Sequence, residues 1–472
     1  MPFSSLTFIF LFFPIVLFLF YILPNRIWRN AILATASIGF FIWSDPTHIH
    51  VLLFAVLFNF IFGKVIGGFN EKGKLYASKT YMWIAVSINI LTLAFYKYTG
   101  FFFEIIQYFT NLSINYNTPS LPLGVSFFTF SGISYILDVY NSIEKPERSF
   151  VAFSAYMTMF PKLLQGPITR YKQVKTELQH QKFLPEEMLK GVRRFIAGLA
   201  KKVLLADSLG VATTKIFDSD ISAIGADLAW FGLIAYTLQI YLDFSGYTDM
   251  AIGLGKIFGL TLPENFNFPY ISKSISEFWR RWHMTLTAWF RTYLFIPLEF
   301  ARKKSKFLRQ QTNLLIVFLL TGLWHGASWN FVAWGIYFGF ILAIESSGLG
   351  KLLKKVPIIM QHVYTLALVM IGWIFFRLTD IQDWGMFYKA LFGFNGWSSV
   401  TTFRSLNIVY YVPFIIPALG FSFPLMEKMQ NKVRNKGGIS LILIDAVYLG
   451  IFILTLTFIL AKGFTAFMYA QF

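Results

Sequence analysis

The residue best suited to chemistry in this sequence is His325, which lies between two long apolar stretches. Ionisable side chains within apolar, membrane-like segments are costly and are usually kept for function. A neutral imidazole is a general base of suitable pKa near pH 7, and burial favours that neutral form. Gly322 and Gly326 flank the histidine and permit a helix break or the close approach of a substrate to the backbone. We predict a catalytic histidine; the alternative is a core histidine that donates a hydrogen bond to a backbone carbonyl.

A second histidine, His283, lies in a short basic segment that is rich in tryptophan. Ser274 and Glu277 have the spacing of a capping box, so we predict that a helix begins at Ser274. Trp279 and His283 are four residues apart and would share one face of that helix. A basic, amphipathic, Trp-rich helix is typical of a membrane surface. Two interpretations stay open: a surface anchor, or the wall of a funnel in which arginines attract an anionic donor and His283 lies at the mouth.

Two carboxylates, Asp243 and Asp249, lie in an apolar region between residues 228 and 262. Carboxylates in such a region require cationic or hydrogen-bonding partners. The nearest plausible cations in the sequence are Arg280, Arg281 and Arg291. We predict a structural polar network of Asp243, Asp249 and Arg291, and paired carboxylates of the glycosidase kind are the alternative.

The composition indicates which elements position these side chains. Of the 472 residues, 56% are hydrophobic and 14% are charged, whereas soluble proteins carry about 25% charged residues. The apolar runs are continuous rather than alternating, which favours membrane-spanning helices over a β-barrel. We expect an all-α, polytopic membrane protein with about 11 or 12 crossings and with re-entrant and interfacial helices. The first run, 6–23, has no basic segment before it and is expected to be a retained membrane helix rather than a signal peptide.

The net charge of +18 is carried by Lys and Arg in the connections between apolar runs. This placement follows the positive-inside rule and argues against a nucleic-acid partner; the lipid bilayer is the expected partner. Basic residues follow the first apolar run and are absent from the next connection, so the N-terminus is expected outside and the cytoplasmic segments at 24–30, 162–202, 302–309 and 428–436. The sequence contains no cysteine, which excludes disulfides, thiolate nucleophiles and Cys-ligated metals, and we predict no metal site.

No soluble domain is expected, because the longest polar stretch, 166–190, is too short to fold alone. We expect a single integral-membrane domain over residues 1–472, with N-terminal helices in 1–140, core motifs in 141–346 and C-terminal helices in 347–472. No internal repeat is visible, which weakens a transporter built from inverted halves.

With its motifs in this order, the sequence resembles the membrane-bound O-acyltransferase superfamily, in particular its branch of bacterial alginate and peptidoglycan O-acetyltransferases. The likeness spans nearly the whole chain and is carried by Gly166-Pro167-Ile168, Asp243 to Gly255, Glu264-Asn265-Phe266, Pro269-Tyr270, Glu277 to His283 and Gly322 to Gly326. The resemblance implies a helical ring around a tunnel and a location in the bacterial cytoplasmic membrane.

The resemblance also implies roles for the candidate residues. The essential histidine of the family falls on His325, which would deprotonate an acceptor hydroxyl, and the second histidine falls on His283. An acetyl group from a cytosolic donor, acetyl-CoA, would cross through the tunnel to an extracytoplasmic serine acyltransferase or esterase-like partner, or directly to a polysaccharide. No bound cofactor is implied. The candidates for donor binding or tunnel lining are Arg280, Arg281, Trp279, Trp282, Trp324 and Asn330.

Two departures from the family pattern leave the acceptor open. Arg291-Thr292-Tyr293 replaces the usual Arg-Asp-Tyr, and Pro297 to Ala301 replaces a glycine-rich loop of the alginate systems. The acceptor is expected to be an alginate-like glycan, peptidoglycan or another envelope polysaccharide. Other classes stay open: a transporter or flippase, a scaffold for an export complex, and a lipid or protein acyltransferase of the same superfamily.

Overall fold

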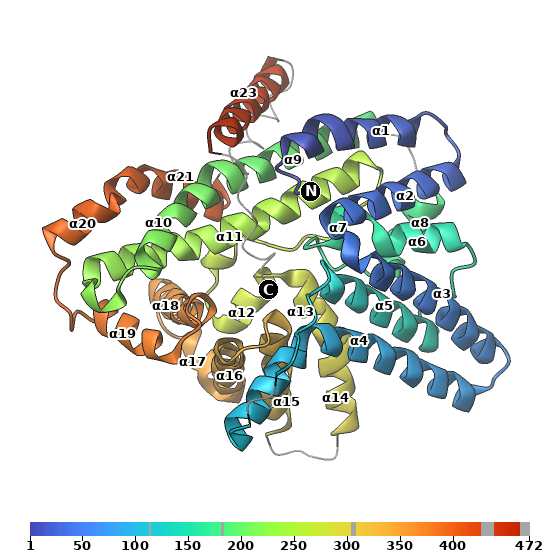
Figure 1. The fold of residues 1–472 in the computed structure, drawn as a ribbon, viewed down its shortest axis with the longest axis horizontal. Helices are drawn as coiled ribbons and strands as arrows, with labels where there is room; N and C mark the ends of the chain where they lie inside the picture. Colours follow the sequence, from blue (N-terminus) through green and yellow to red (C-terminus); the bar gives the residue numbers. More distant parts are fainter. Residues whose placement is uncertain (113–114, 181–183, 304–307, 426–438, 463–472) are drawn as a thin grey trace. The chain divides into compact units, whose positions relative to one another are not determined.

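The described part of the chain is built of helices joined by turns and loops, with no β-strand among the described residues (Figure 1). The computed structural model describes residues 1–112, 115–180, 184–303, 308–425 and 439–462. The predicted basic segment 428–436 and part of the segment 302–309 therefore lie outside the described residues. The all-α class that was predicted from the apolar runs is confirmed.

The chain divides into two compact units, which are described separately. One unit comprises Met1–Phe195 and Thr248–Glu264, and the other comprises Ile196–Tyr247 and Asn265–Phe472. The boundaries at 140 and 346 within a single domain stay a prediction.

The first unit consists mainly of long apolar helices. Its π-helical turn and helices are η1 (Phe8–Phe12), α1 (Phe13–Tyr21), α2 (Arg26–Ser44), α3 (Ile49–Glu71), α4 (Leu75–Thr110), α5 (Val125–Tyr140), α6 (Phe150–Thr158), α7 (Phe160–Leu163), α8 (Tyr171–Gln179) and most of α9 (Pro185–Ala200). The amides of Asn59 on α3 and Asn89 on α4 donate to each other at 3.2 and 3.0 Å. Such a reciprocal amide pair joins two apolar helices where water is scarce.

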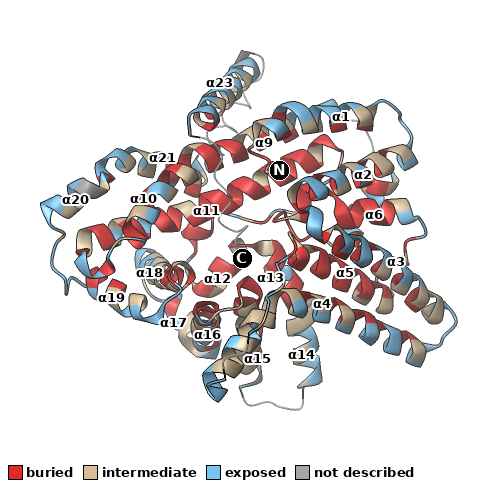
Figure 2. Ribbon diagram, viewed as in Figure 1, coloured by how far each residue is buried: buried red, intermediate tan, exposed pale blue. Residues whose placement is uncertain are grey.

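The second unit contains both candidate histidines. Its helices are α10 (Asp207–Phe217), the greater part of α11 (Ala226–Ile257), α12 (Ile275–Arg281), α13 (Met284–Phe290), α14 (Ile296–Ala301), α15 (Arg309–His325), α16 (Trp329–Ile344), α17 (Gly350–Leu353), α18 (Ile358–Arg377), α19 (Ile381–Leu391), α20 (Val400–Leu406), α21 (Val412–Ser422) and α23 (Ile439–Lys462). Figure 2 shows α11 buried along most of its length and α23 largely exposed.

Five helices of the described residues are long and apolar enough to cross a membrane: Pro46–Glu71, Leu75–Thr110, Trp329–Leu353, Ile358–Arg377 and Ser440–Ala461. These helices expose many large apolar side chains, which on α23 include Ile442, Leu443, Val447 and Leu460. Exposed apolar faces on long helices are suited to contact with lipid. The protein is therefore a multi-pass membrane protein, while the number of crossings and the ring around a tunnel stay predictions.

The helix predicted to begin at Ser274 does begin there but ends sooner than expected. Ser274 Oγ accepts the N–H of Glu277 at 3.0 Å, as an N-cap should. The helix ends before His283, whose backbone adopts a left-handed conformation with φ of 44° between α12 and α13. The prediction that Trp279 and His283 share one helix face is therefore wrong.

The physical reason for this break is a pairing with a segment earlier in the chain. The N–H of Asn267 donates to the carbonyl of Arg281 at 2.9 Å, and the N–H of Met284 donates to the carbonyl of Asn265 at 2.8 Å. These two bonds lie on either side of His283 and hold the chain there in a non-helical conformation. Histidine is among the few residues that tolerate the left-handed region, at a cost of about 1–3 kcal/mol that the surrounding bonds must offset.

Candidate functional site

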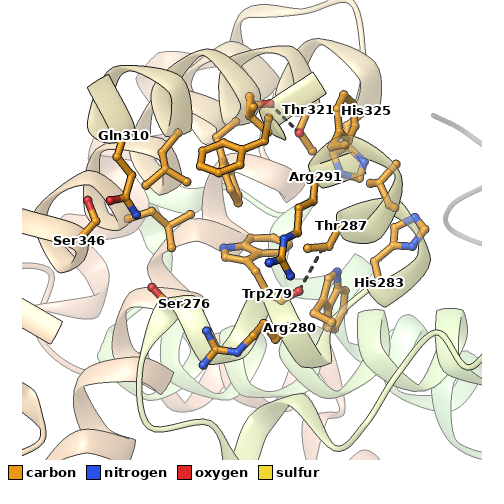
Figure 3. Close-up of a pocket in the computed structure, with 18 residues that line it drawn as sticks. Ser276, Trp279, Arg280, His283, Thr287, Arg291, Gln310, Thr321, His325 and Ser346 are labelled. Atoms are coloured by element: carbon orange, nitrogen blue, oxygen red, sulfur yellow. Dashed lines mark hydrogen bonds between the residues drawn. The ribbon is translucent and has the colours of Figure 1, made fainter. Parts of the chain in front are cut away.

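A cavity of about 240 Å³ lies in the second unit and is lined by residues of α12, α13, α15 and α16 and of the segments that directly adjoin these helices (Figure 3). Both predicted catalytic histidines, His325 and His283, line it. Figure 3 shows the two histidines toward one side of the cavity and Gln310 and Ser346 toward the other. Aromatic and aliphatic side chains, among them Trp279 and Trp282, form much of the wall. The remaining polar side chains are Ser276, Arg280, Thr287, Arg291 and Thr321.

His325 is the last residue of α15 and is only 4% exposed. Its ring packs edge-on against Trp334 at 5.0 Å between centroids. A Cβ atom at Gly322 would lie 2.3 Å from the carbonyl oxygen of Phe331, and one at Gly326 would lie 2.2 Å from the Phe331 ring. The flanking glycines therefore permit α15 to pack closely on α16, and this packing positions the His325 ring.

His283 is 1% exposed, and its Nδ1 lies 3.0 Å from Oδ1 of Asn265. Its Nε2 is buried and has no hydrogen-bond partner among the described residues. The ring packs edge-on against Phe244 at 4.8 Å. The ring of Trp324 contacts both histidines, at 6.0 Å from His283 and 4.9 Å from His325. Trp324, which was predicted to bind the donor or line a tunnel, does not line this cavity but packs against both candidate catalytic rings.

The arginines predicted to bind a donor occupy different positions. Arg280 and Arg291 line the cavity, are exposed, and form no ion pair within the described chain. Arg281 does not line the cavity, and its Nε donates to Glu277 at 2.8 Å. Guanidinium groups without a carboxylate partner are available to a phosphate or carboxylate ligand.

Of the other residues predicted to bind the donor or line a tunnel, some line the cavity and some do not. Trp279 and Trp282 line the cavity, and the indole Nε1 of Trp279 is buried without a hydrogen-bond partner among the described residues. Asn330 does not line it. Its side chain donates to the carbonyl of Phe375 at 3.1 Å and accepts a hydrogen bond from Ser328, which are contacts of a structural residue.

The two carboxylates of α11 have other partners than the predicted ones. Asp243 pairs with Lys202 at 2.7 Å, and Asp249, in the first unit, pairs with Arg194 at 2.9 Å. Arg291 does not pair with either carboxylate. The prediction of a network with Arg291 is therefore wrong, because the cations come from an earlier part of the chain that the order of the sequence does not bring near.

Two buried residues that support the site were not singled out from the sequence. Glu345 accepts the N–H groups of Ile275 and Ser276 at 2.8 Å each, at the start of α12. Asn265 accepts bonds at the start of α13. The sequence signals that could have identified them were weak. Glu345 is an acidic residue at the end of an apolar run, and Asn265 belongs to a motif to which no role was assigned from the sequence.

The sequence pattern of the membrane-bound O-acyltransferase family matches residues 38–378, a range that includes both cavity histidines. The chain belongs to this family. This O-acyltransferase is 38% identical over 402 residues to the probable alginate O-acetylase AlgI of Azotobacter vinelandii, a match that covers 84% of this chain and 79% of that protein. It is 31% identical over 433 residues to the peptidoglycan O-acetyltransferase of Helicobacter pylori, with 84% and 80% covered. It is 31% identical over 232 residues to the teichoic acid D-alanyltransferase of Bacillus subtilis, with 47% and 58% covered.

Family membership confirms the predicted resemblance and the enzyme class, so the protein is a membrane-embedded O-acyltransferase. The donor, the acceptor, the partner and the individual roles of His325 and His283 stay predictions. Among the described residues, no group of three or more His, Asp or Glu side chains could hold a metal ion.

Proposed function

We propose that this O-acyltransferase transfers an acetyl group from cytosolic acetyl-CoA to an extracytoplasmic envelope glycan, either directly or by way of a serine acyltransferase or esterase-like partner. The observation that carries the proposal is that His325 and His283 line one cavity together with Arg280 and Arg291. The names of the relatives, an alginate O-acetylase and a peptidoglycan O-acetyltransferase, support acetyl transfer to a glycan.

In the proposed reaction, His325 takes the proton of the attacking hydroxyl. The hydroxyl oxygen bonds to the carbonyl carbon of the thioester, and the C–S bond then breaks. The proton returns from the imidazolium to the sulfur, so the products are an acetyl ester and the free thiol of CoA. The aromatic wall of the cavity limits water, which would otherwise hydrolyse the thioester.

The size of the cavity supports a short acyl group. Its volume of about 240 Å³ is below the roughly 300–1,000 Å³ that is usual for pockets that enclose drug-sized ligands. An acetyl group with the adjoining end of its carrier is a better match than a long lipid chain. Arg280 and Arg291 would bind the phosphates of the carrier.

The distribution of basic residues supports an orientation. Arg26 and Arg29 follow the first apolar run, and the connection 44–50 carries no Lys or Arg. We assign the N-terminus to the outside of a bacterial cytoplasmic membrane on this basis. The donor would then enter from the basic, cytoplasmic side.

The proposal is tested by the O-acetyl content of the envelope polysaccharides in cells whose deleted gene is replaced by a His325→Ala variant. We expect acetylation to fall to the level of the deletion strain. His180→Ala is the matched control, because His180 is exposed and its side chain makes no hydrogen bond among the described residues. Normal acetylation in the His325→Ala strain, at normal protein levels, contradicts the proposal. The glycan that loses its acetyl groups identifies the acceptor.

A further inference from the structure

The side-chain oxygen of Asn265 meets three polar groups next to the candidate catalytic ring of His283. Asn265 is 1% exposed and belongs to the segment that pairs with the chain between α12 and α13. Its Oδ1 lies 3.2 Å from the backbone N of Thr285, 2.9 Å from Thr285 Oγ and 3.0 Å from Nδ1 of His283. Its Nδ2 has no hydrogen-bond partner among the described residues.

These contacts determine which side-chain atom of Asn265, the amide oxygen or the amide nitrogen, faces Thr285 and His283. The backbone N–H of Thr285 can only donate a hydrogen bond, so the atom of Asn265 that it meets must be the oxygen. The same oxygen contacts Nδ1 of His283. Since an oxygen of an amide only accepts, Nδ1 must carry the hydrogen.

The state of the other ring nitrogen follows from this assignment. Burial lowers the pKa of His283 to about 3, so the ring is neutral at physiological pH. His283 lies outside the helices that are long enough to cross a membrane. A neutral imidazole carries one hydrogen, and with that hydrogen on Nδ1 the Nε2 atom is an acceptor. Nε2 is also the nitrogen that has no partner among the described residues.

We infer that Asn265 is a positioning residue of the acyl transfer: its side-chain oxygen holds His283 in the Nδ1–H tautomer, so that Nε2 offers the cavity a hydrogen-bond acceptor for a hydroxyl of the incoming glycan. This inference rests on the proposed function and on its direct route, because it takes the cavity as the site of acyl transfer and the glycan as the acceptor that enters it. Sugars carry several hydroxyls, so one is held at His283 while its neighbour gives its proton to His325. In the opposite tautomer Nε2 would donate instead and could not accept the hydroxyl hydrogen.

The tautomer can be observed without any measurement of activity. Solid-state ¹⁵N NMR of the histidine-labelled protein in lipid distinguishes a protonated ring nitrogen from an unprotonated one. The chain has 6 histidines, and the His283 signals are those lost in His283→Gln. We expect an unprotonated Nε2 in the unsubstituted protein and a changed tautomer mixture in Asn265→Ala. A protonated Nε2 in the unsubstituted protein overturns the inference.

Kinetics of the purified protein in proteoliposomes test the consequence of the tautomer. Asn265→Ala is expected to lower kcat/KM for the glycan acceptor by roughly 10- to 100-fold, the range known for removal of the partner that orients a metal-ligating histidine. KM for acetyl-CoA is expected to stay near its original value. Asn267→Ala is the matched control. Asn267 lies two residues away, its side chain is exposed, and only its backbone takes part in the pairing.

Asn265→Asp provides a rescue that a merely structural role does not predict. The carboxylate still accepts the hydrogen bonds of Thr285 and His283, so we expect Asn265→Asp to be more active than Asn265→Ala. Its negative charge favours protonated His283, so the acid limb of the pH–rate profile moves to higher pH. Wild-type kinetics in Asn265→Ala, or an unmoved acid limb in an active Asn265→Asp, overturns the inference.

Different results would contradict the proposed function and the positioning role of Asn265. If His325→Ala and His283→Ala both retain acetyl transfer, the proposed function is wrong, whatever the NMR shows. If both lose acetyl transfer while Asn265→Ala keeps its kinetics and its tautomer, only the positioning role of Asn265 is wrong.

Discussion

The carboxylate of Glu345 accepts the backbone N–H of Ser276 at 2.8 Å and the hydroxyl of the same residue at 2.6 Å. Its other oxygen accepts the N–H of Ile275 at 2.8 Å. A residue that follows α16 thus satisfies the first N–H groups of α12, where a helix has no internal acceptors. Because Ser276 and Ser346 both line the cavity, this contact holds two parts of its wall together.

Glu345→Ala is expected to lower the free energy of unfolding by about 2–4 kcal/mol, since each orphaned buried donor costs about 1–3 kcal/mol. Glu345→Gln keeps one oxygen acceptor and should lose less. Denaturation of the purified protein in detergent, followed by circular dichroism, measures the difference. Glu104→Ala, at an exposed position on α4, should change stability by less than about 0.5 kcal/mol. Equal effects of the Glu345 and Glu104 substitutions would contradict the capping role.

Lys202→Met should destabilise the protein by about 3–5 kcal/mol, because it leaves the carboxylate of Asp243 buried without its cation. Both side chains of this pair are 3% exposed. Lys202 also pairs with Asp207 at 2.7 Å. Adding Asp243→Asn removes the more deeply buried of the two uncompensated charges, so the double variant should be more stable than Lys202→Met alone. The exposed pair of Lys190 and Glu187 is the comparison: Lys190→Met should cost less than about 1 kcal/mol. A double variant no more stable than Lys202→Met contradicts the pairing.

The sequence revealed the helical class but not the long-range polar contacts. Continuous apolar runs and the cost of exposing backbone to lipid are local properties, and they predicted helices correctly. The partners of Asp243 and Asp249 are not local. Lys202 and Arg194 reach them only once an earlier segment lies near α11, so proximity in the sequence selected the wrong arginines.

Arg280→Ala and Arg291→Ala should each raise KM for acetyl-CoA by about 10-fold, the lower range for loss of a charge-assisted hydrogen bond. Because both arginines are exposed, the effect should shrink as the ionic strength rises. Initial rates at several salt concentrations provide the measurement. Lys273→Ala removes an exposed cation near α12 that does not line the cavity, and it should leave KM unchanged. If KM for acetyl-CoA is unchanged in both arginine variants, the donor binds elsewhere in the protein.

Trp279→Phe keeps an aromatic ring in the cavity wall and removes the buried indole N–H that has no partner within the described chain. If that N–H donates to a carbonyl oxygen of the donor, KM for acetyl-CoA should rise by about 3- to 10-fold, which is about 1 kcal/mol. Trp373→Phe is the matched control, because its indole N–H is also buried and unpartnered but does not line the cavity. Equal kinetics for the two variants rule out a donor contact at Trp279.

The candidate site was partly predictable for a similar reason. The glycines on both sides of His325 and the helix cap at Ser274 are local signals. They drew attention to His325 and to the segment that ends at His283, and the fold brings both histidines to one cavity. The break at His283 was not predictable from its spacing to Trp279. It depends on the backbone of Asn265 and Asn267, which pairs with the chain at that point and overrides the local preference for a continuous helix.

Turnover of labelled acetyl-CoA by the purified protein in proteoliposomes measures the role of His325 most directly. Relative to the unsubstituted protein, His325→Ala should lower kcat by about 10²- to 10⁴-fold, the usual contribution of a general base, while its melting temperature stays close to the original. His180→Ala should turn over at the original rate. A folded His325→Ala protein that transfers acetyl groups at the rate of the His180→Ala protein would contradict the assignment of His325 as the base.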